Sequence, residues 1–318
     1  MKLATTTSDF GIHSKSLSEL VRFYEGTGFR WLDLNLYQSI HPGSAFLDAG
    51  WERWIAAGGE AALDLDIRFC QAHAPHGNLY ATGEEFQVFL DATRRAILAC
   101  SRLGIPHIVT HQQDIGGFPS LENRRLNLQR NREFFEKLFP VMEETGVLVL
   151  IENTCDQHAP TRDENRRHFP STAAELVELA EFINHPLLQI CWDTGHANIQ
   201  GVDQYRSIIE LGGRLRAVHI QDNYGDMDSH VAPFQGTTNM DSVMQGLLDS
   251  GYRGHFTFES SNLLRNGGAW PNYRREWEYR GAKVTRLMHV PLALRRQAVA
   301  LLYQIGKHIL CEYGCFEE

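Results

Sequence analysis

Four short apolar segments of this chain each end in a side chain that can bind a metal ion. They span residues 147–152, 188–193, 215–219 and 255–259. Each has the length and apolar content of a buried strand, and parallel strands in a barrel bring their carboxyl ends to one face. Two glutamates, one aspartate and one histidine offer hard oxygens and one imidazole, which suit Mn²⁺, Zn²⁺, Co²⁺ or Mg²⁺. The sequence therefore predicts one divalent metal ion, held by Glu152, Asp193, His219 and Glu259.

Strand and helix signals alternate along the chain. The expected strands are 2–6, 30–36, 67–73, 107–111, 148–152, 188–193, 216–220 and 255–259. Segments with helical periodicity lie between them, at 16–24, 84–103, 121–145, 172–183, 203–211 and 241–250. Eight strand–helix units predict an α/β fold, a (β/α)₈ TIM barrel that forms a single domain over residues 1–318. The alternative, a doubly wound sheet, would need a glycine-rich phosphate loop after an early strand, and the sequence has none.

Three stretches are longer than simple connections, at residues 37–64, 155–170 and 262–281. Each follows the carboxyl end of an expected strand, so we expect all three on the catalytic face as walls or lids. Residues 283–318 are expected to form a helical extension that closes the barrel or packs on a partner subunit. The second alternative would make the protein a homo-oligomer.

Composition narrows the class of protein. The 318 residues are 43% hydrophobic and 22% charged, with a net charge of −9. An acidic chain argues against nucleic acid as a partner, because a nucleic-acid surface needs a basic stripe. The N-terminus lacks a signal-peptide pattern and no later segment is long enough to span a membrane, so we expect a cytoplasmic protein. The six cysteines are expected to be reduced thiols.

Further polar residues stand close to the predicted ligands. His196 follows Asp193 by three residues, where a tight turn can place it over the metal, and His73 and His111 end two expected strands. We expect these three to face the substrate, and we expect Asp222 to orient His219. Asp228 and His230 follow in the stretch after His219. For these two residues the sequence allows either a substrate contact or a hydrogen bond that fixes the loop.

Four ordered motifs carry a resemblance to a known family. They are Ile-Glu-Asn at 151–153, Asp-Thr-Gly-His at 193–196, His-x-x-Asp-Asn at 219–223 and Phe-Glu-Ser at 258–260. The chain from residue 1 to about 262 resembles the xylose-isomerase-like superfamily of metal-dependent barrels. That group contains sugar and sugar-phosphate isomerases and epimerases, inosose dehydratases and barrel-type AP endonucleases.

Resemblance to the ketose epimerases implies a reaction. The four predicted ligands would hold the ion, and Glu152 and Glu259 would also be the acid/base pair. One glutamate would take a proton from a sugar carbon and the other would return it to the opposite face, through a metal-stabilised enediolate. His196 would donate a hydrogen bond to the substrate oxygen on which negative charge develops. The resemblance thus predicts a carbohydrate isomerase or epimerase with a small sugar substrate.

Resemblance to the AP endonucleases implies a trinuclear zinc phosphodiesterase instead. His73, His111 and Glu152 would hold one zinc, the four ligands named above a second, and His196, Asp228 and His230 a third. The acidic charge and the Gln-Asp-Asn at 221–223, a form usual in the sugar enzymes, favour the epimerase. Two departures from the ketose epimerases, at Tyr224 and Phe234, also leave open a dehydratase or lyase acting on oxidised sugars or inososes.

Overall fold

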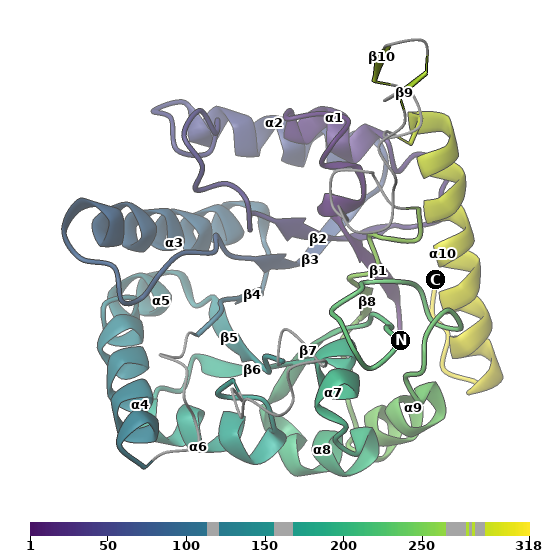
Figure 1. Cartoon of the computed structure of the whole chain (residues 1–318). Helices are drawn as coiled ribbons and strands as arrows, with labels where there is room; N and C mark the ends of the chain where they lie inside the picture. Colours follow the sequence, from purple (N-terminus) through teal and green to yellow (C-terminus); the bar gives the residue numbers. More distant parts are fainter. Residues whose placement is uncertain (113–120, 156–167, 265–277, 280–281, 284–289) are drawn as a thin grey trace.

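The computed structural model describes residues 1–112, 121–155, 168–264, 278–279, 282–283 and 290–318. Eight parallel strands form one sheet in the order β7-β6-β5-β4-β3-β2-β1-β8, and helices surround it (Figure 1). A parallel bridge between Ile220 and Phe258 brings its two ends together. The chain therefore forms the predicted (β/α)₈ barrel.

The strands lie where the hydrophobic pattern predicts them, with every boundary within two residues of the expected one. They are β1 (Leu3–Thr6), β2 (Trp31–Asn35), β3 (Arg68–His73), β4 (His107–Val109), β5 (Leu148–Glu152), β6 (Leu188–Asp193), β7 (Leu215–His219) and β8 (Phe256–Phe258). A separate antiparallel pair is formed by β9 (Glu278–Tyr279) and β10 (Ala282–Lys283).

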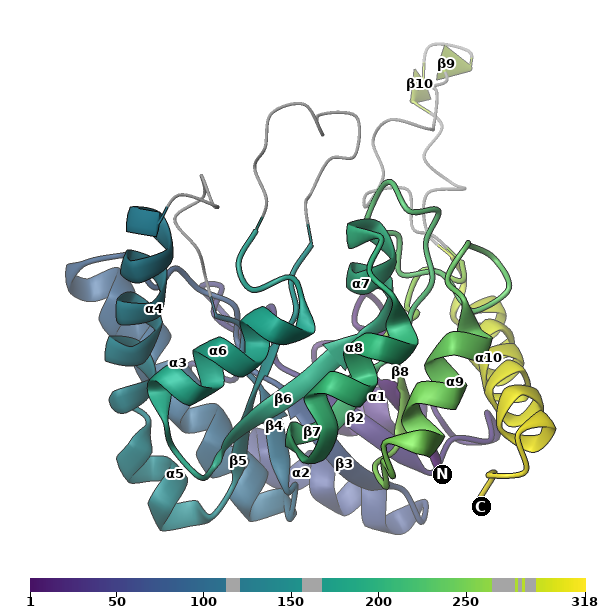
Figure 2. The ribbon, with the colours of Figure 1, turned by 90° about the horizontal axis from the view of Figure 1, so that it is seen from below.

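The helices connect these strands on the outside of the barrel (Figure 2). The α-helices are α1 (Leu17–Arg22), α2 (Trp51–Asp64), α3 (Gly83–Leu103), α4 (Leu121–Glu136), α5 (Phe139–Thr145), α6 (Ala173–Ile183), α7 (Thr194–Gln200), α8 (Gln204–Leu211), α9 (Met240–Asp249) and α10 (Leu292–Glu312). The 3₁₀ turns of the described residues are η1 (Thr7–Phe10) and η3 (Gly212–Arg214). Within the described ranges, none of the helices is both long and apolar enough to cross a bilayer.

The expected long stretch at 37–64 is only partly a loop, because its second half is helix α2. Gly58 and Gly59 lower the helix propensity of this segment, so its periodicity was obscured in the sequence. The structure shows why a glycine suits position 58: a Cβ there would lie 2.4 Å from the Leu17 side chain of α1. Of the other two expected long stretches, residues 156–167 and 265–277 lie outside the described part of the chain.

The expected helix at 121–145 is divided into α4 and α5. Pro140 lies in the first turn of α5, where its missing N–H costs nothing, whereas within a continuous helix it would remove a hydrogen bond. The C-terminal helix α10 packs on the strands where the barrel closes. A Cβ on its Gly306 would lie 2.6 Å from both Leu3 of β1 and Phe258 of β8, so the helix approaches these strands closely.

Apolar side chains pack on both sides of the sheet, and buried polar side chains lie among them in the barrel interior. Leu32, Leu34 and Ile151 belong to the large core between strands and helices. A smaller cluster occupies part of the barrel interior and consists of Val109, Leu150, Cys191 and Ala217. As expected for reduced thiols, none of the six cysteines forms a disulfide in the described residues.

Asp9 of η1 is a buried carboxyl group. Its Oδ2 accepts hydrogen bonds from Thr5 Oγ1 at 2.7 Å and from Tyr24 Oη at 3.3 Å. Burial raises the pKa of Asp9 from its ordinary value of 3.8 to about 7. The folded protein therefore favours the protonated form of this group, and its contribution to stability is lost as the pH rises through about 7.

We expect Asp9→Asn to stabilise the protein at pH 8 by on the order of 2 kcal/mol, because an amide needs no proton to stay neutral. The amide oxygen can accept the same two hydrogen bonds. Urea unfolding of both proteins at pH 5 and pH 8 measures the difference. A variant that is equally destabilised at both pH values would contradict the expectation.

Candidate metal centre

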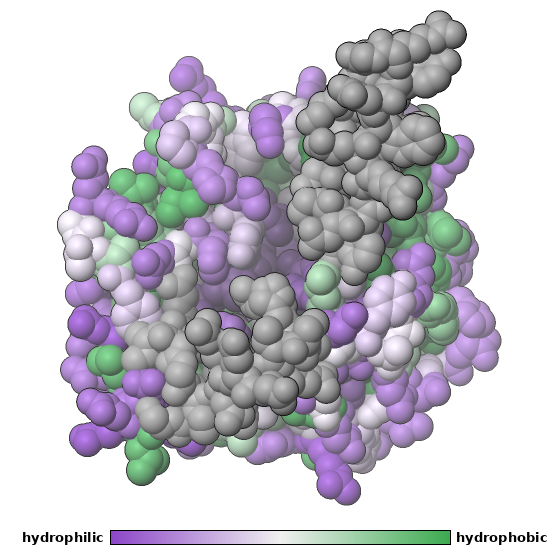
Figure 3. Space-filling view, in the orientation of Figure 1, coloured by the Kyte–Doolittle hydropathy of each residue, from purple (hydrophilic) through white to green (hydrophobic). Residues whose placement is uncertain are grey.

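The carboxyl ends of four neighbouring strands position the predicted ligands. Glu152 is the last residue of β5, and the pairing of β6 with β7 places Asp193 beside His219. Glu259 follows β8, where its backbone N–H donates to Ile220 O at 3.0 Å. Seen from this end of the barrel, the middle of the molecule is a hydrophilic hollow (Figure 3). The strand ends therefore bring all four side chains to the catalytic face.

These four side chains converge on one point. His219 Nδ1 lies 2.6 Å from Glu152 Oε1 and 3.5 Å from Glu259 Oε2. One potential ligand atom from each of Glu152, Asp193, His219 and Glu259 lies within 4.8 Å of the other three. Three of the residues are buried, and the Glu259 side chain is 13% exposed. The group has the size and the donor atoms that one divalent cation requires.

Two buried carboxylate oxygens that accept no hydrogen bond indicate that these residues fit a cation. Among the described residues, Glu152 Oε2 and Asp193 Oδ2 are buried without a hydrogen-bond partner. Such carboxylate oxygens are costly unless a positive charge or a donor compensates them. Burial, together with the charges of Glu152 and Glu259, raises the pKa of Asp193 to about 7. A divalent ion held here would supply the missing charge.

Glu152 and His219 are joined by a hydrogen bond of 2.6 Å between Oε1 and Nδ1. Burial opposes ionisation of Glu152, but the facing His219 imidazole holds the pKa of that carboxyl below its ordinary range. Burial likewise opposes the charge on His219, whose pKa is nevertheless raised by its acidic neighbours, Glu152 and Glu259 among them. A metal ion bound at His219 Nδ1 would have to displace the proton of this hydrogen bond, so metal and proton compete for the site.

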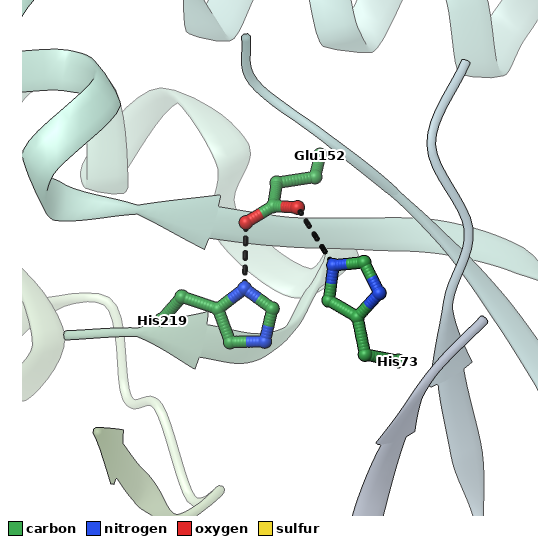
Figure 4. A group of neighbouring side chains, drawn as sticks. All are labelled: His73, Glu152 and His219. Carbon is green, nitrogen blue, oxygen red and sulfur yellow. Dashed lines mark hydrogen bonds and ion pairs between the residues drawn. The ribbon is translucent and has the colours of Figure 1, made fainter. Parts of the chain in front are cut away.

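His73 and His111 stand next to Glu152 on the other side. Figure 4 shows the Glu152 carboxylate between His219 and His73. His111 Nε2 lies 3.0 Å from His73 Nε2 and 3.3 Å from Glu152 Oε2. Burial lowers the pKa of His111 to about 3, so its imidazole is neutral and can offer a lone pair. The structure thus brings both histidines to the centre, while their roles stay predictions.

A third group lies where β6 and the segment after β7 meet. His196 Nε2 is 3.4 Å and His230 Nε2 is 2.9 Å from Asp228 Oδ2. The other ring nitrogens are fixed by backbone carbonyls, His196 Nδ1 by Asn153 O and His230 Nδ1 by Glu259 O, both at 2.8 Å. His230 adopts a left-handed φ of 47°, a strained conformation typical of functional sites. Substrate contacts by His196, Asp228 and His230 stay predictions.

The expected role of Asp222 is wrong. Its carboxylate accepts hydrogen bonds from the backbone N–H groups of Asn223, Gly236 and Thr238, and so holds the segment 222–238 together. Because β7 ends at His219, Asp222 belongs to the segment after the strand, where it bridges Val231. The other ring nitrogen of His219, Nε2, faces the carboxylate of Asp33, whose Oδ2 lies 3.5 Å away.

Asp33 was missed, although the sequence contained a signal for it. On β2 the alternation of Leu32, Asp33 and Leu34 places the two leucines in the outer core and Asp33 on the barrel interior, where it is fully buried. Gln71 Nε2 lies 3.4 Å from its Oδ2. An acidic residue between two leucines of a strand with two-residue periodicity therefore indicates a polar side chain in the barrel interior.

Two amides that were also missed hold the ligands in place. Asn153 exchanges two hydrogen bonds with the backbone of Asp193, at 2.7 and 2.9 Å. Gln221 Nε2 donates to Asp228 Oδ1 at 2.6 Å and to Asp193 Oδ1 at 3.3 Å. Gly195 makes room for this amide, because a Cβ there would lie 2.1 Å from Gln221 Cδ. The Asp-Thr-Gly-His motif is thus a packing requirement as well as a chemical one.

The xylose isomerase-like TIM barrel family matches residues 21–277 of this chain. The chain belongs to this family.

Curated relatives resemble parts of the chain. An uncharacterised protein of Sinorhizobium fredii is 25% identical over 174 residues, which is 54% of this chain and 52% of that protein. A ketose 3-epimerase of Arthrobacter globiformis is 30% identical over 120 residues, 35% of this chain and 39% of the relative. A probable endonuclease 4 of Methanoculleus marisnigri is 30% identical over 144 residues, 41% and 46% of the two chains. The chain thus spans about half the length of these relatives or less.

Solved structures resemble the whole chain. A D-tagatose 3-epimerase-like protein superimposes with a TM-score of 0.68 at 18% identity, over 99% of this chain and all of the other. A 3-keto-D-glucoside 4-epimerase from E. coli gives 0.65 at 16% identity, over 96% and 99% of the two chains. At these identities the likeness shows a shared fold.

Proposed function

We propose that this protein is a divalent-metal-dependent isomerase or epimerase acting on a sugar or a sugar phosphate. The observation that carries the proposal is the convergence of Glu152, Asp193, His219 and Glu259 within 4.8 Å at the strand ends. The names of the ketose 3-epimerase relative and of the epimerase structures support the carbohydrate substrate class. The family alone leaves the reaction open.

The proposed chemistry needs two carboxylates and one positive charge. When bound, a divalent cation would lower the cost of negative charge on the sugar oxygens while the carbon lacks its proton. Glu152 and Glu259 would hold and move that proton: one removes it from the carbon beside the carbonyl, and the other delivers a proton to the opposite face. The two glutamates come from β5 and the end of β8, and His219 lies between them.

His196 would stabilise the substrate oxygen on which charge develops. Burial opposes its charge, but Asp193 and Asp228 raise the pKa of His196 well above its ordinary value. A charged imidazole fixed by Asn153 O is a directed donor that needs little reorganisation during the reaction. Further substrate contacts are assigned in this proposal to His73, His111, Asp228 and His230.

The test is to follow hydrogen exchange without knowing the product. Purified protein loaded with Mn²⁺ or Co²⁺ is incubated in heavy water with D-fructose, D-tagatose, D-allulose and their phosphates, and deuterium at the carbon beside the carbonyl is measured by NMR. We expect one metal ion per chain and exchange with at least one sugar. A loss of water or of a glycosidic group from the substrate would identify the dehydratase or lyase instead. Absence of both reactions from the loaded protein would refute the proposal.

A trinuclear zinc phosphodiesterase is the second candidate. One observation favours it: two further sets of potential ligands adjoin the four residues of the proposed metal centre. They are the pair His73–His111 and the group His196–Asp228–His230, which could hold further ions. The net charge of −9 counts against it, because phosphate backbones bind basic surfaces. Three zinc ions per chain and cleavage of DNA at abasic sites would establish this activity.

A further inference from the structure

The end of the barrel opposite the metal centre carries a cluster of basic side chains around one tryptophan. We define this basic mouth cluster as Lys2, Trp31, Arg68, His107 and His255. Each stands at or just before the start of a strand, and parallel strands all start on the same face. In Figure 2 the start of β1 and both chain termini lie on the side away from α7. The cluster therefore lies far from the catalytic face.

Strand pairing brings these residues together. Trp31 of β2 pairs with Arg68 of β3, and the N–H of Phe256 donates to Lys2 O at 2.9 Å, which places Lys2 beside His255. The Lys2 ammonium lies 5.0 Å and the Arg68 guanidinium carbon 5.6 Å from the centroid of the indole. The His255 ring lies 4.7 Å from it, tilted by 50°. Two cations and an imidazole thus surround a single indole.

The carboxylate of Glu317 offsets the positive charge of this cluster only in part, because the terminal ammonium shares it. Within the described ranges, neither Lys2 nor Arg68 forms an ion pair with a carboxylate, and His255 Nε2 is buried without a hydrogen-bond partner. The nearby Glu317 is bonded to the terminal ammonium at 3.0 Å. Burial is the main reason that the pKa of His255 is lowered to about 4, and the charge of Lys2 adds to the effect. The pKa of His107 is also lowered to about 4, mainly by burial and further by the charge of His255. Cation–π contacts to Trp31 offset only part of this repulsion.

We propose that the basic mouth cluster binds a small, multiply charged anion of the phosphate class. The Lys2 ammonium and the Arg68 guanidinium would neutralise it, the Nε2–H of His255 would donate to it, and Trp31 would hold the two cations in place. Arginine suits this role because its planar fork binds two phosphate oxygens at once. The anion would satisfy the unpaired imidazole nitrogen and the unpaired charges together. The site is independent of the proposed sugar chemistry.

The test measures binding of inorganic phosphate to the full-length protein after a chelator has removed metal ions. Calorimetry gives the affinity, and the NMR signal of the His255 ring reports on the site. We expect one phosphate per chain, a shift of that signal on binding, and at least a tenfold loss of affinity in Arg68→Gln. Arg30→Gln is the matched control, since Arg30 precedes Trp31 but is paired with Asp66 at 2.7 Å; its affinity should be unchanged.

Lys2→Gln gives a second, independent reduction of charge if Arg68→Gln fails to fold. Glycerol 3-phosphate distinguishes the sources of the anion: tighter binding than inorganic phosphate indicates a phosphorylated metabolite, and equal binding indicates free phosphate. Either result supports the site. No binding at millimolar phosphate, or equal binding by the wild type and the Arg68 or Lys2 variant, would overturn it.

Discussion

Replacing Glu259 with Gln is expected to abolish deuterium exchange at the substrate carbon, by at least about 10³-fold in rate, in an otherwise folded protein. The Glu259 side chain is 13% exposed at the mouth of the barrel, and its Oε2 lies 3.5 Å from His219 Nδ1. An amide of the same size keeps the packing but can neither take up a proton nor bind a divalent ion as strongly. The loss should therefore appear in the chemical step and in metal affinity.

Glu152→Gln is expected to give the same loss of exchange with a larger cost to the fold. Glu152 is buried and faces His219 at 2.6 Å, so its removal leaves the raised-pKa imidazole without its hydrogen-bonded carboxylate. Measuring exchange, metal content and thermal stability in both variants separates these effects. If either glutamine variant exchanges deuterium at the wild-type rate, that residue is not a proton carrier.

A matched control comes from a buried glutamate outside the centre. Glu175 caps helix α6: its Oε2 accepts from Ser171 N at 2.8 Å and from Thr172 N at 3.2 Å. Glutamine is equally suited to a capping box, so Glu175→Gln should fold and retain full exchange. The control shows whether replacing a buried glutamate is harmful in itself.

The barrel and the four converging ligands could be predicted because both depend on local patterns. A short apolar run marks each of the four ligand-bearing strands, and a polar residue at its carboxyl end must lie on the shared face of parallel strands. The segment Leu188–Asp193 shows both signals at once. The register between neighbouring strands then places the ligand residues side by side, as the pairing of Asp193 with His219 shows.

What escaped prediction depends on hydrogen bonds and contacts that residue spacing does not reveal. The turn expected after Asp193 is the helix α7, which starts because Asp193 Oδ1 accepts from the backbone N–H of His196 at 2.6 Å. A ligand that also caps a helix cannot be recognised from spacing alone. Asp222 was misassigned for a similar reason, since its three partners come from its own loop. The carboxylate beside His219 Nε2 is that of Asp33, nearly two hundred positions earlier in the chain.

Removing the metal should eliminate deuterium exchange and lower the melting temperature, and the size of the second effect should depend on pH. A cation at 100 times its Kd would stabilise the folded chain by about 2.7 kcal/mol. Protonated Asp193 cannot bind a cation, and its pKa is raised to about 7. Protons therefore compete with the metal below about pH 7, and the stabilisation by Mn²⁺ or Co²⁺ should increase from pH 6 to pH 8.

Asp193→Asn provides the decisive comparison for this prediction. The asparagine removes a buried, crowded carboxyl group, so without metal the variant should melt at or above the temperature of the chelator-treated wild type. Added Mn²⁺ or Co²⁺ should no longer raise its melting temperature at any pH, because one charged ligand is gone. A metal-induced shift of full size in this variant would mean that the ion binds elsewhere, and the four-residue centre would then lose its support as the site of catalysis.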